Sequence, residues 1–437
     1  MHKSYHWFKN QILSLGGEAL WVILGQILSV VILFGGVRLM TQILSPHEYG
    51  KLAIIMSLVN GALYSVGQAL KMTATRYYSV MVNDKNPNWY WDFFSKTIRY
   101  ATFFLALMVF LCFFLSSGLG NDWVTGFGWA IATVLAFTVL INAIAYGVQN
   151  GARNRKVFVF HQVLFDGGRI CFAFIIAYSL SGSAVNAVSG FVLAGCMILI
   201  SQLYFLLKLK KTFYIANSNI DTDRIHQLYS YTWPLLIGGA LGWVQMFSDR
   251  WALKTLSSYA DVGIYFAIYQ TMYSFWIYVS LMLGNFLGTI FFSKIKDGSD
   301  PVAHMKMLKM NEYVAIFYFA CVLICFIVLM PLKEWISTLL FADEYRAAAV
   351  LLPWMALSGG LYGIGQQLLY SIYGGISSRK IIPIKASSAV VAIILHFTGA
   401  FYWGVKGVVF GGLVFSFFYM ATAFKAHLNE KQRLLNI

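Results

Sequence analysis

Long apolar runs alternate with short polar gaps along the whole chain. Each run holds roughly 20 residues, which is the length of an α-helix that crosses a hydrocarbon core ~30 Å thick. Inside lipid the backbone amides of a segment pair with one another, so the runs are predicted to be helices, whereas a β-barrel would show alternating strands of ~10 residues. The pattern predicts twelve spans, near residues 18–41, 49–71, 98–118, 126–148, 157–179, 184–207, 231–253, 262–290, 311–331, 347–372, 381–402 and 406–427.

Composition agrees with this pattern and excludes a soluble protein. Of the 437 residues, 59% are hydrophobic and 11% are charged, against about 25% charged residues in soluble domains. No loop is long enough to form a folded domain, and the longest loops, about 72–97, 208–230 and 291–310, are basic. A membrane-bound polymerase or ligase needs a sizeable outer loop for its catalytic groups, and none is present. We therefore predict an all-α polytopic membrane protein that is not an enzyme.

Basic residues gather in every second gap between the spans. The gaps on the opposite side contain only Arg38, Lys51, Arg250, Lys254, Lys333, Arg346 and Lys406. By the positive-inside rule, the basic gaps and both termini lie in the cytoplasm. This topology accounts for the net charge of +15, so nucleic-acid binding is not expected. The first apolar run is about a full span and lacks a small-residue cleavage site, so we expect it to remain in the protein.

A helix-start signal lies in the gap between the first two spans, at residues 43–50, ILSPHEYG. We call this stretch a corner, because the chain reverses direction here between two spans. Ser45 suits an N-cap, Pro46 suits the first helical position, and Glu48 can reach back to complete a capping box. A similar stretch, SSYADVGIY, follows the seventh span half a chain later. The matched pairs are Arg38 with Arg250, Ser45 with Ser258, Glu48 with Asp261 and Gly50 with Gly263.

This repeat divides the chain into two bundles of six helices. We predict bundles at residues 1–208 and 230–437, joined by a cytoplasmic linker at 209–229. Because six is an even number, the two bundles insert in the same orientation. They are predicted to be related by a pseudo-two-fold axis along the membrane normal, an arrangement found in transporters.

Two opposite charges lie near the centre of the fifth span, in FHQVLFDGGRICF. Asp166 and Arg169 are three residues apart, so they can pair on one helix face. Ionisable groups at this depth are costly and point to function. Two interpretations stay open: a structural ion pair that holds the bundle, or a polar cavity in which Arg169 faces an anionic substrate and Asp166 couples transport to an ion.

Other polar groups in or near the spans are weaker candidates for the same cavity. Arg38 and Arg250 lie near the outer ends of their spans, where each can snorkel to the interface or face the cavity, and Asp249 can neutralise Arg250. Arg76, like Lys71, ends the second span on the cytoplasmic side, where it can meet a phosphate or simply follow the positive-inside rule. Gln26 can contact the substrate or make an interhelical hydrogen bond.

The motifs of nucleotide and metal chemistry are missing. The sequence has no Walker A motif, no Gly-rich nucleotide loop, no nucleophile elbow and no zinc-ligand spacing. We therefore expect no cofactor and no ATP hydrolysis by this chain. Transport would be downhill, coupled to H⁺ or Na⁺, or driven by metabolism on one side of the membrane.

Four motifs resemble those of one family of transporters. The first span and its corner, GQILSVVILFGGVRLMTQILSPHEYG, resemble bacterial polysaccharide transporters of the O-antigen flippase type. Three more stretches are similar to motifs of that family. They are TATRYYS at 73–79, the Pro-containing seventh span with DRW at 249–251, and VGIY at 262–265. The family is part of the multidrug/oligosaccharidyl-lipid/polysaccharide exporter superfamily.

The resemblance implies a fold and a task. Two six-helix bundles would form a MATE-like V around a central, often cationic, cavity in the bacterial inner membrane. The implied substrate is an undecaprenyl-diphosphate-linked oligosaccharide for lipopolysaccharide O-antigen, capsule or exopolysaccharide, moved from the cytoplasmic to the periplasmic leaflet. Membrane lipid, a polysaccharide polymerase and glycosyltransferases are the implied partners. In this sequence the first candidate to bind the diphosphate is Arg169, followed by Arg38 and Arg250.

Two other classes of protein stay open at this point. A cation-coupled multidrug antiporter of the same superfamily would share the fold but needs a carboxylate-rich cavity, which Asp166 would suit and the LSPHEYG corner disfavours. A membrane scaffold without transport activity would not need paired bundles or charge at mid-membrane depth.

Overall fold

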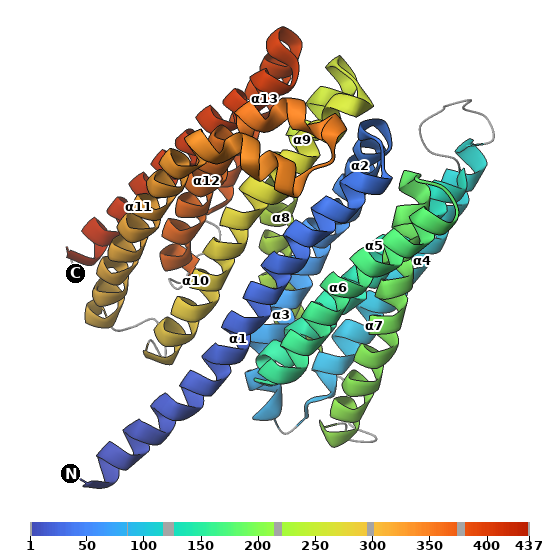
Figure 1. The fold of residues 1–437 in the computed structure, drawn as a ribbon. Helices are drawn as coiled ribbons and strands as arrows, with labels where there is room; N and C mark the ends of the chain where they lie inside the picture. Colours follow the sequence, from blue (N-terminus) through green and yellow to red (C-terminus); the bar gives the residue numbers. More distant parts are fainter. Residues whose placement is uncertain are drawn as a thin grey trace.

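The computed structural model describes residues 2–84, 86–116, 126–213, 221–294, 301–373 and 381–435. Helices make up nearly all of these residues, and no strand occurs among them. Figure 1 shows α1–α7 to one side of the molecule and α8–α13 to the other, with the helices running roughly alongside one another. We call these two groups the N-half and the C-half.

The N-half contains seven α-helices and one short π-helical turn. In chain order they are α1 (His2–Ile43), α2 (Pro46–Ala62), η1 (Leu63–Gly67), α3 (Gln68–Val82), α4 (Asn88–Ser116), α5 (Gly126–Gly151), α6 (Arg155–Ser179) and α7 (Ala184–Phe213).

The C-half follows with a similar series of helices. Its elements are α8 (Thr222–Leu256), α9 (Tyr259–Ile268), the π turn η2 (Tyr269–Tyr273), α10 (Ser274–Lys294), α11 (Pro301–Leu340), the 3₁₀ segment η3 (Asp343–Leu351), α12 (Leu352–Tyr373) and α13 (Ile381–Leu435). A π turn therefore interrupts the second span of each half, a feature without a signal in the sequence.

The segment α13 consists of two antiparallel helices that meet at Gly404. This glycine has a φ of +54°, the left-handed conformation that glycine adopts without strain. A Cβ placed on Gly399 would lie 2.4 Å from the Gly407 carbonyl oxygen, and one on Gly411 would lie 2.6 Å from that of Leu395. Residues that lie earlier in the first helix thus contact residues that lie later in the second, which is the pattern of an antiparallel hairpin. Spans 381–402 and 406–427 were predicted as such neighbours.

The spans are often longer than the sequence pattern predicted. Eight segments of the described residues are long and apolar enough to cross a membrane, among them Pro46–Val82 and His304–Leu340. The helices extend past the apolar runs because amphipathic residues continue them beyond the hydrocarbon. The total of twelve crossings and the bundle boundaries stay predictions. Within the predicted linker, residues 214–220 lie outside the described part of the chain, and α7 and α8 continue on either side.

The two helix-start corners form as predicted, with one correction. The Ser45 hydroxyl accepts from the Glu48 amide at 3.4 Å, and the Ser258 hydroxyl accepts from the Asp261 amide at 3.1 Å. The prediction that the Glu48 side chain reaches back to the corner to complete the capping box is wrong. The Glu48 carboxylate instead accepts from the Ala184 amide at 2.9 Å, so it caps the first turn of α7 and ties the corner to that helix.

These matched corners pack directly against each other where the halves meet. A Cβ on Gly50 would lie 1.8 Å from the Tyr259 carbonyl oxygen, and one on Gly263 would lie 1.9 Å from that of Pro46. Figure 1 shows α2 and α9 at the same end of the molecule. Only glycine permits so close a backbone approach, which explains why the repeat has glycine at both positions.

We predict that Gly50→Ala destabilises the folded protein by about 1–3 kcal/mol, because the added methyl overpacks the contact with α9. The measurement is thermal unfolding of the purified protein in detergent. Gly35→Ala is the matched control, since a Cβ at Gly35 meets no atom within 4 Å and alanine favours a helix. Equal melting temperatures for the two variants would contradict the close contact.

Candidate functional site

One seam between the halves runs along α8 and the second span of the N-half. The Trp243 indole donates to the Ser57 carbonyl at 2.7 Å, and the Thr73 and Thr232 hydroxyls are 2.9 Å apart. Between these two contacts, a Cβ on Gly239 would lie 2.1 Å from the Tyr64 carbonyl oxygen. The two segments therefore touch from residue 57 to residue 73 on one side and from residue 232 to residue 243 on the other.

The charged pair predicted in α6 is present. The Arg169 guanidinium lies 3.2 Å from the Asp166 carboxylate, and the Ser29 hydroxyl of α1 donates to that carboxylate at 2.9 Å. Asp166 is buried, with 8% of its surface exposed. The carboxylate is thus held by two partners from two helices, which meets the cost of burying its charge.

Arg169 lies at the boundary between the halves. Its guanidinium lies beside the hydroxyl of Tyr278 of α10, which belongs to the C-half. The side chain is 24% exposed, and its buried Nε atom has no hydrogen-bond partner among the described residues. Arg169 therefore keeps donor capacity in addition to its ion pair, so it is more than a closed structural bridge.

Gln26 lies one turn below Ser29 on α1. It is buried, and its side-chain oxygen has no hydrogen-bond partner within the described residues. An unpartnered amide oxygen at this depth costs free energy unless water or a ligand donates to it. Together with Ser29, it gives α1 a polar strip beside the charged pair.

Arg38 holds the halves together at the end of the molecule where the corners meet. Its guanidinium donates to the carbonyl oxygens of Phe341 and, at 3.3 Å, Thr338 at the C-terminus of α11. Carbonyls at a helix C-terminus lack intrahelical donors and attract cations. Beside this contact, the Tyr345 hydroxyl donates to the Leu44 carbonyl at 2.6 Å. Arg38 therefore closes the seam between α1 and α11.

Arg250 has entirely different surroundings from its sequence counterpart Arg38. It is 1% exposed, and its guanidinium lies 4.2 Å from the Tyr269 ring centre and 4.6 Å from that of Phe247. The Asp249 carboxylate is equally buried and accepts from the Tyr265 hydroxyl at 2.6 Å. In this conformation Arg250 is enclosed by aromatic rings and does not reach the interface, and its role in substrate binding stays a prediction.

A small polar cavity of about 10 Å³ lies beside Asp249 inside the C-half. Ser358 and His396 are among its lining residues, and His396 pairs with the Ser248 hydroxyl at 2.8 Å. The volume is near the lower limit for one water molecule. Sequence reasoning missed this cluster because its members come from α8, α12 and α13, far apart along the chain.

Two further cations lie toward the basic end of the N-half. The Lys71 ammonium lies 5.7 Å from the Phe158 ring centre, and the part of the chain that the structure describes gives it no acidic partner. Arg76 stacks on Tyr231 of the C-half at 4.5 Å. In the C-half, Lys385 of α13 donates to the Gly238 carbonyl of α8 at 3.2 Å.

The described residues hold no group of three or more His, Cys, Asp or Glu side chains that could bind a metal ion. The site is instead a charged and hydroxyl-bearing boundary between two helical halves, formed by Ser29, Asp166, Arg169 and Tyr278. Such a boundary can bind a polar group and release it when the halves move apart.

Solved structures define the class of fold. The structure "Lipid II flippase MurJ, inward closed conformation" has a TM-score of 0.71 and 13% identity, covering 96% of this chain and 90% of that chain. An inward-facing multidrug resistance MATE transporter of the MOP superfamily gives 0.71 and 13%, covering 96% and 99%. A MATE transporter from Vibrio cholerae gives 0.68 and 14%, covering 97% and 98%. The fold is that of the MATE and MurJ proteins, which confirms the predicted MATE-like fold.

The chain belongs to the family described as "Polysaccharide biosynthesis protein", whose profile matches residues 15–286. This match covers most of the N-half and the start of the C-half, including both corner motifs, and it confirms the family resemblance predicted from them. No curated protein matches the chain.

We predict that Arg38→Ala opens the seam between α1 and α11, because two charge-assisted hydrogen bonds across the halves are lost. Leu44→Cys is the reporter, since Leu44 is 1% exposed. In a cysteine-free background, a membrane-impermeant maleimide should label it about tenfold faster in the Arg38→Ala variant.

Arg346→Ala is the control for this experiment. Arg346 lies at the same end of the molecule, but its ion pair with Asp343 stays within η3. Labelling that rises equally in both variants would mean that general charge loss, rather than the bond across the seam, is measured.

Proposed function

We propose that the protein is a flippase that moves an undecaprenyl-diphosphate-linked oligosaccharide from the cytoplasmic to the periplasmic leaflet of a bacterial inner membrane. The observation that carries this proposal is Arg169, a cation at mid-span that contacts both halves and keeps an unused donor. Membership of the polysaccharide biosynthesis family supports the class of substrate. The structural likeness to a lipid II flippase supports the mode of action.

The physical task fits this arrangement. A sugar diphosphate cannot cross ~30 Å of hydrocarbon without polar partners. Arginine presents a planar fork of donors that matches phosphate oxygens. Lys71, without an acidic partner among the described residues, offers a first contact nearer the basic end, and Arg169 offers the next at greater depth. The isoprenoid tail would remain in lipid throughout.

Coupling follows from competition for Arg169. While the site holds no substrate, Asp166 pairs with Arg169 at 3.2 Å. A diphosphate that binds Arg169 withdraws this partner, and Asp166 keeps only the Ser29 hydroxyl. A carboxylate that loses its cation at this depth binds H⁺ or Na⁺ more readily. Asp166 is therefore our candidate for the coupling group.

Alternating access requires that the outer contacts separate. Rocking of residues 1–208 against 230–437 would break the bonds from Arg38 to α11 and the contact of Gly50 with α9. The headgroup would then leave toward the periplasm, where a polymerase consumes it, while glycosyltransferases supply it on the cytoplasmic side. No cofactor or catalytic step is part of this scheme.

We predict that Arg169→Ala lowers surface glycan by about tenfold or more, because charge-assisted bonds to the diphosphate are lost. The assay is complementation of a strain that lacks the gene, with lipid-linked oligosaccharide accumulating in the cells. Arg169→Lys should give an intermediate result, since it keeps the charge but loses the fork.

Lys208→Ala is the control for a lost charge, because Lys208 is exposed at the end of α7. Wild-type glycan from Arg169→Ala at normal protein levels would contradict the site. Extrusion of a cationic dye by the wild-type protein, without any effect on glycan, would support the multidrug antiporter instead.

We predict that Asp166→Asn makes flipping insensitive to the ion gradient, since asparagine retains a partner for Ser29 but cannot bind the coupling ion. The measurement is headgroup translocation in vesicles with and without an uncoupler or a sodium ionophore. If Asp166→Asn and wild type lose the same fraction of activity, Asp166 is not the coupling group.

A further inference from the structure

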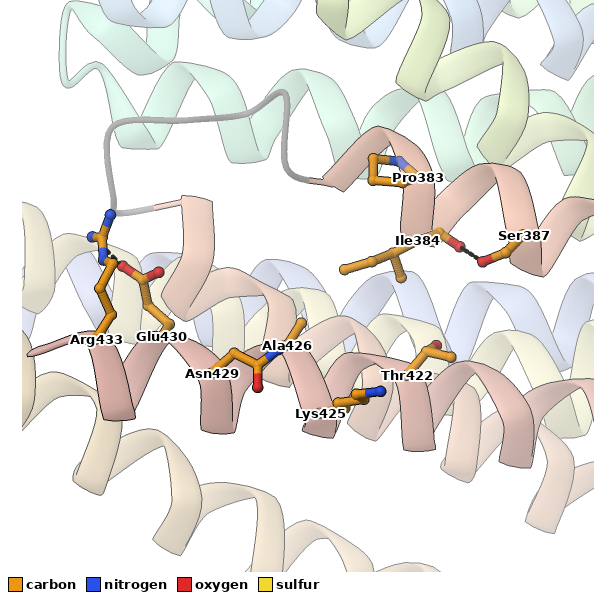
Figure 2. A pocket seen from close by; sticks show the side chains of 9 residues that line it. All are labelled: Pro383, Ile384, Ser387, Thr422, Lys425, Ala426, Asn429, Glu430 and Arg433. Carbon is orange, nitrogen blue, oxygen red and sulfur yellow. Dashed lines mark hydrogen bonds and ion pairs between the residues drawn. The ribbon is translucent and has the colours of Figure 1, made fainter.

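A groove of about 740 Å³ opens between the two helices of α13. These helices touch where Gly399 meets Gly407, and Gly411 approaches Leu395 one turn further along. They separate toward their other ends, which leaves the groove. Figure 2 shows one wall formed by Pro383, Ile384 and Ser387 and the other by the last turns of α13. Pockets of this size accommodate small organic ligands.

The lining of the groove is amphipathic. Pro383, Ile384 and Ala426 give it an apolar part, whereas Lys425 and Asn429 give it a polar part. Glu430, the acidic residue in the lining, is paired with Arg433 (Figure 2). The described residues provide no acidic partner for Lys425, so the groove carries an unneutralised positive charge.

The position of the groove narrows the choice of ligand. It lies at the basic end of the molecule, which the positive-inside rule assigns to the cytoplasmic face. Basic pockets between membrane helices on this side attract anionic lipid headgroups. The lining residues that the structure describes all belong to α13, so the groove is separate from the boundary between the halves through which a transported headgroup would pass.

We propose that this groove binds an anionic phospholipid of the inner leaflet. The lipid phosphate lies at Lys425, with Asn429 as a further hydrogen-bond donor. The parts of the acyl chains nearest the headgroup lie along Pro383, Ile384 and Ala426. The lipid fills the space that the diverging helices leave open and thereby supports the C-half. This site does not depend on what the protein transports.

Native mass spectrometry of the full-length protein with added phosphatidylglycerol or phosphatidylcholine tests the proposal. The wild-type protein should retain phosphatidylglycerol in preference to phosphatidylcholine. Lys425→Ala should weaken its binding about fivefold, as expected for one cation at a membrane surface, and Lys425→Arg should restore it. Ala426→Phe should also weaken binding by filling the groove, with no change of charge.

Lys208→Ala again serves as the control, since it removes a positive charge at the same face without touching the groove, and its binding should equal that of wild type. Equal binding of phosphatidylglycerol by wild type, Lys425→Ala and Ala426→Phe would overturn the proposal. So would displacement of phosphatidylglycerol from wild type by an equal concentration of undecaprenyl phosphate, because the groove would then belong to the isoprenoid lipid.

Discussion

The contact on which the rest of the structure depends is the backbone crossing at Gly50 and Gly263. It brings the two matched corners within van der Waals distance, and the side-chain bonds of Arg38 and Tyr345 can form only because the halves already lie that close. Buried side chains flank the crossing, and the Tyr49 and Phe266 rings lie 5.0 Å apart, so apolar packing adds to the backbone contact.

Membrane-buried arginines are stabilised here in two different ways. Arg250 is enclosed by aromatic rings and is unavailable to any ligand. Arg169 shares its charge with Asp166 but keeps exposure and an unused donor. Both arrangements meet the cost of a cation in a low-dielectric medium, and only in the second is part of the side chain exposed.

The sequence predicted the helices and their local contacts well, but it predicted poorly which residues from different helices contact one another. The caps at Ser45 and Ser258 and the Asp166–Arg169 pair depend on residues close together in the chain and are present, and the described parts of the predicted spans are helical. The hydrogen bond between Glu48 and Ala184 and the proximity of Arg169 to Tyr278 involve residues far apart in the chain, so no local pattern reveals them. The same holds for the π turns, whose extra residue is accommodated by packing rather than by composition.

The crossing of the two corners also has the geometry of an association between separate copies. Gly50 meets the segment that begins at Tyr259, and Gly263 meets the segment that begins at Pro46, so each half offers the same surface to the other. This reciprocal exchange defines an isologous interface. A single unit carrying one such corner could form it as a parallel homodimer. Within one chain the matched positions need not keep the same surroundings, and Arg38 and Arg250 differ in this way.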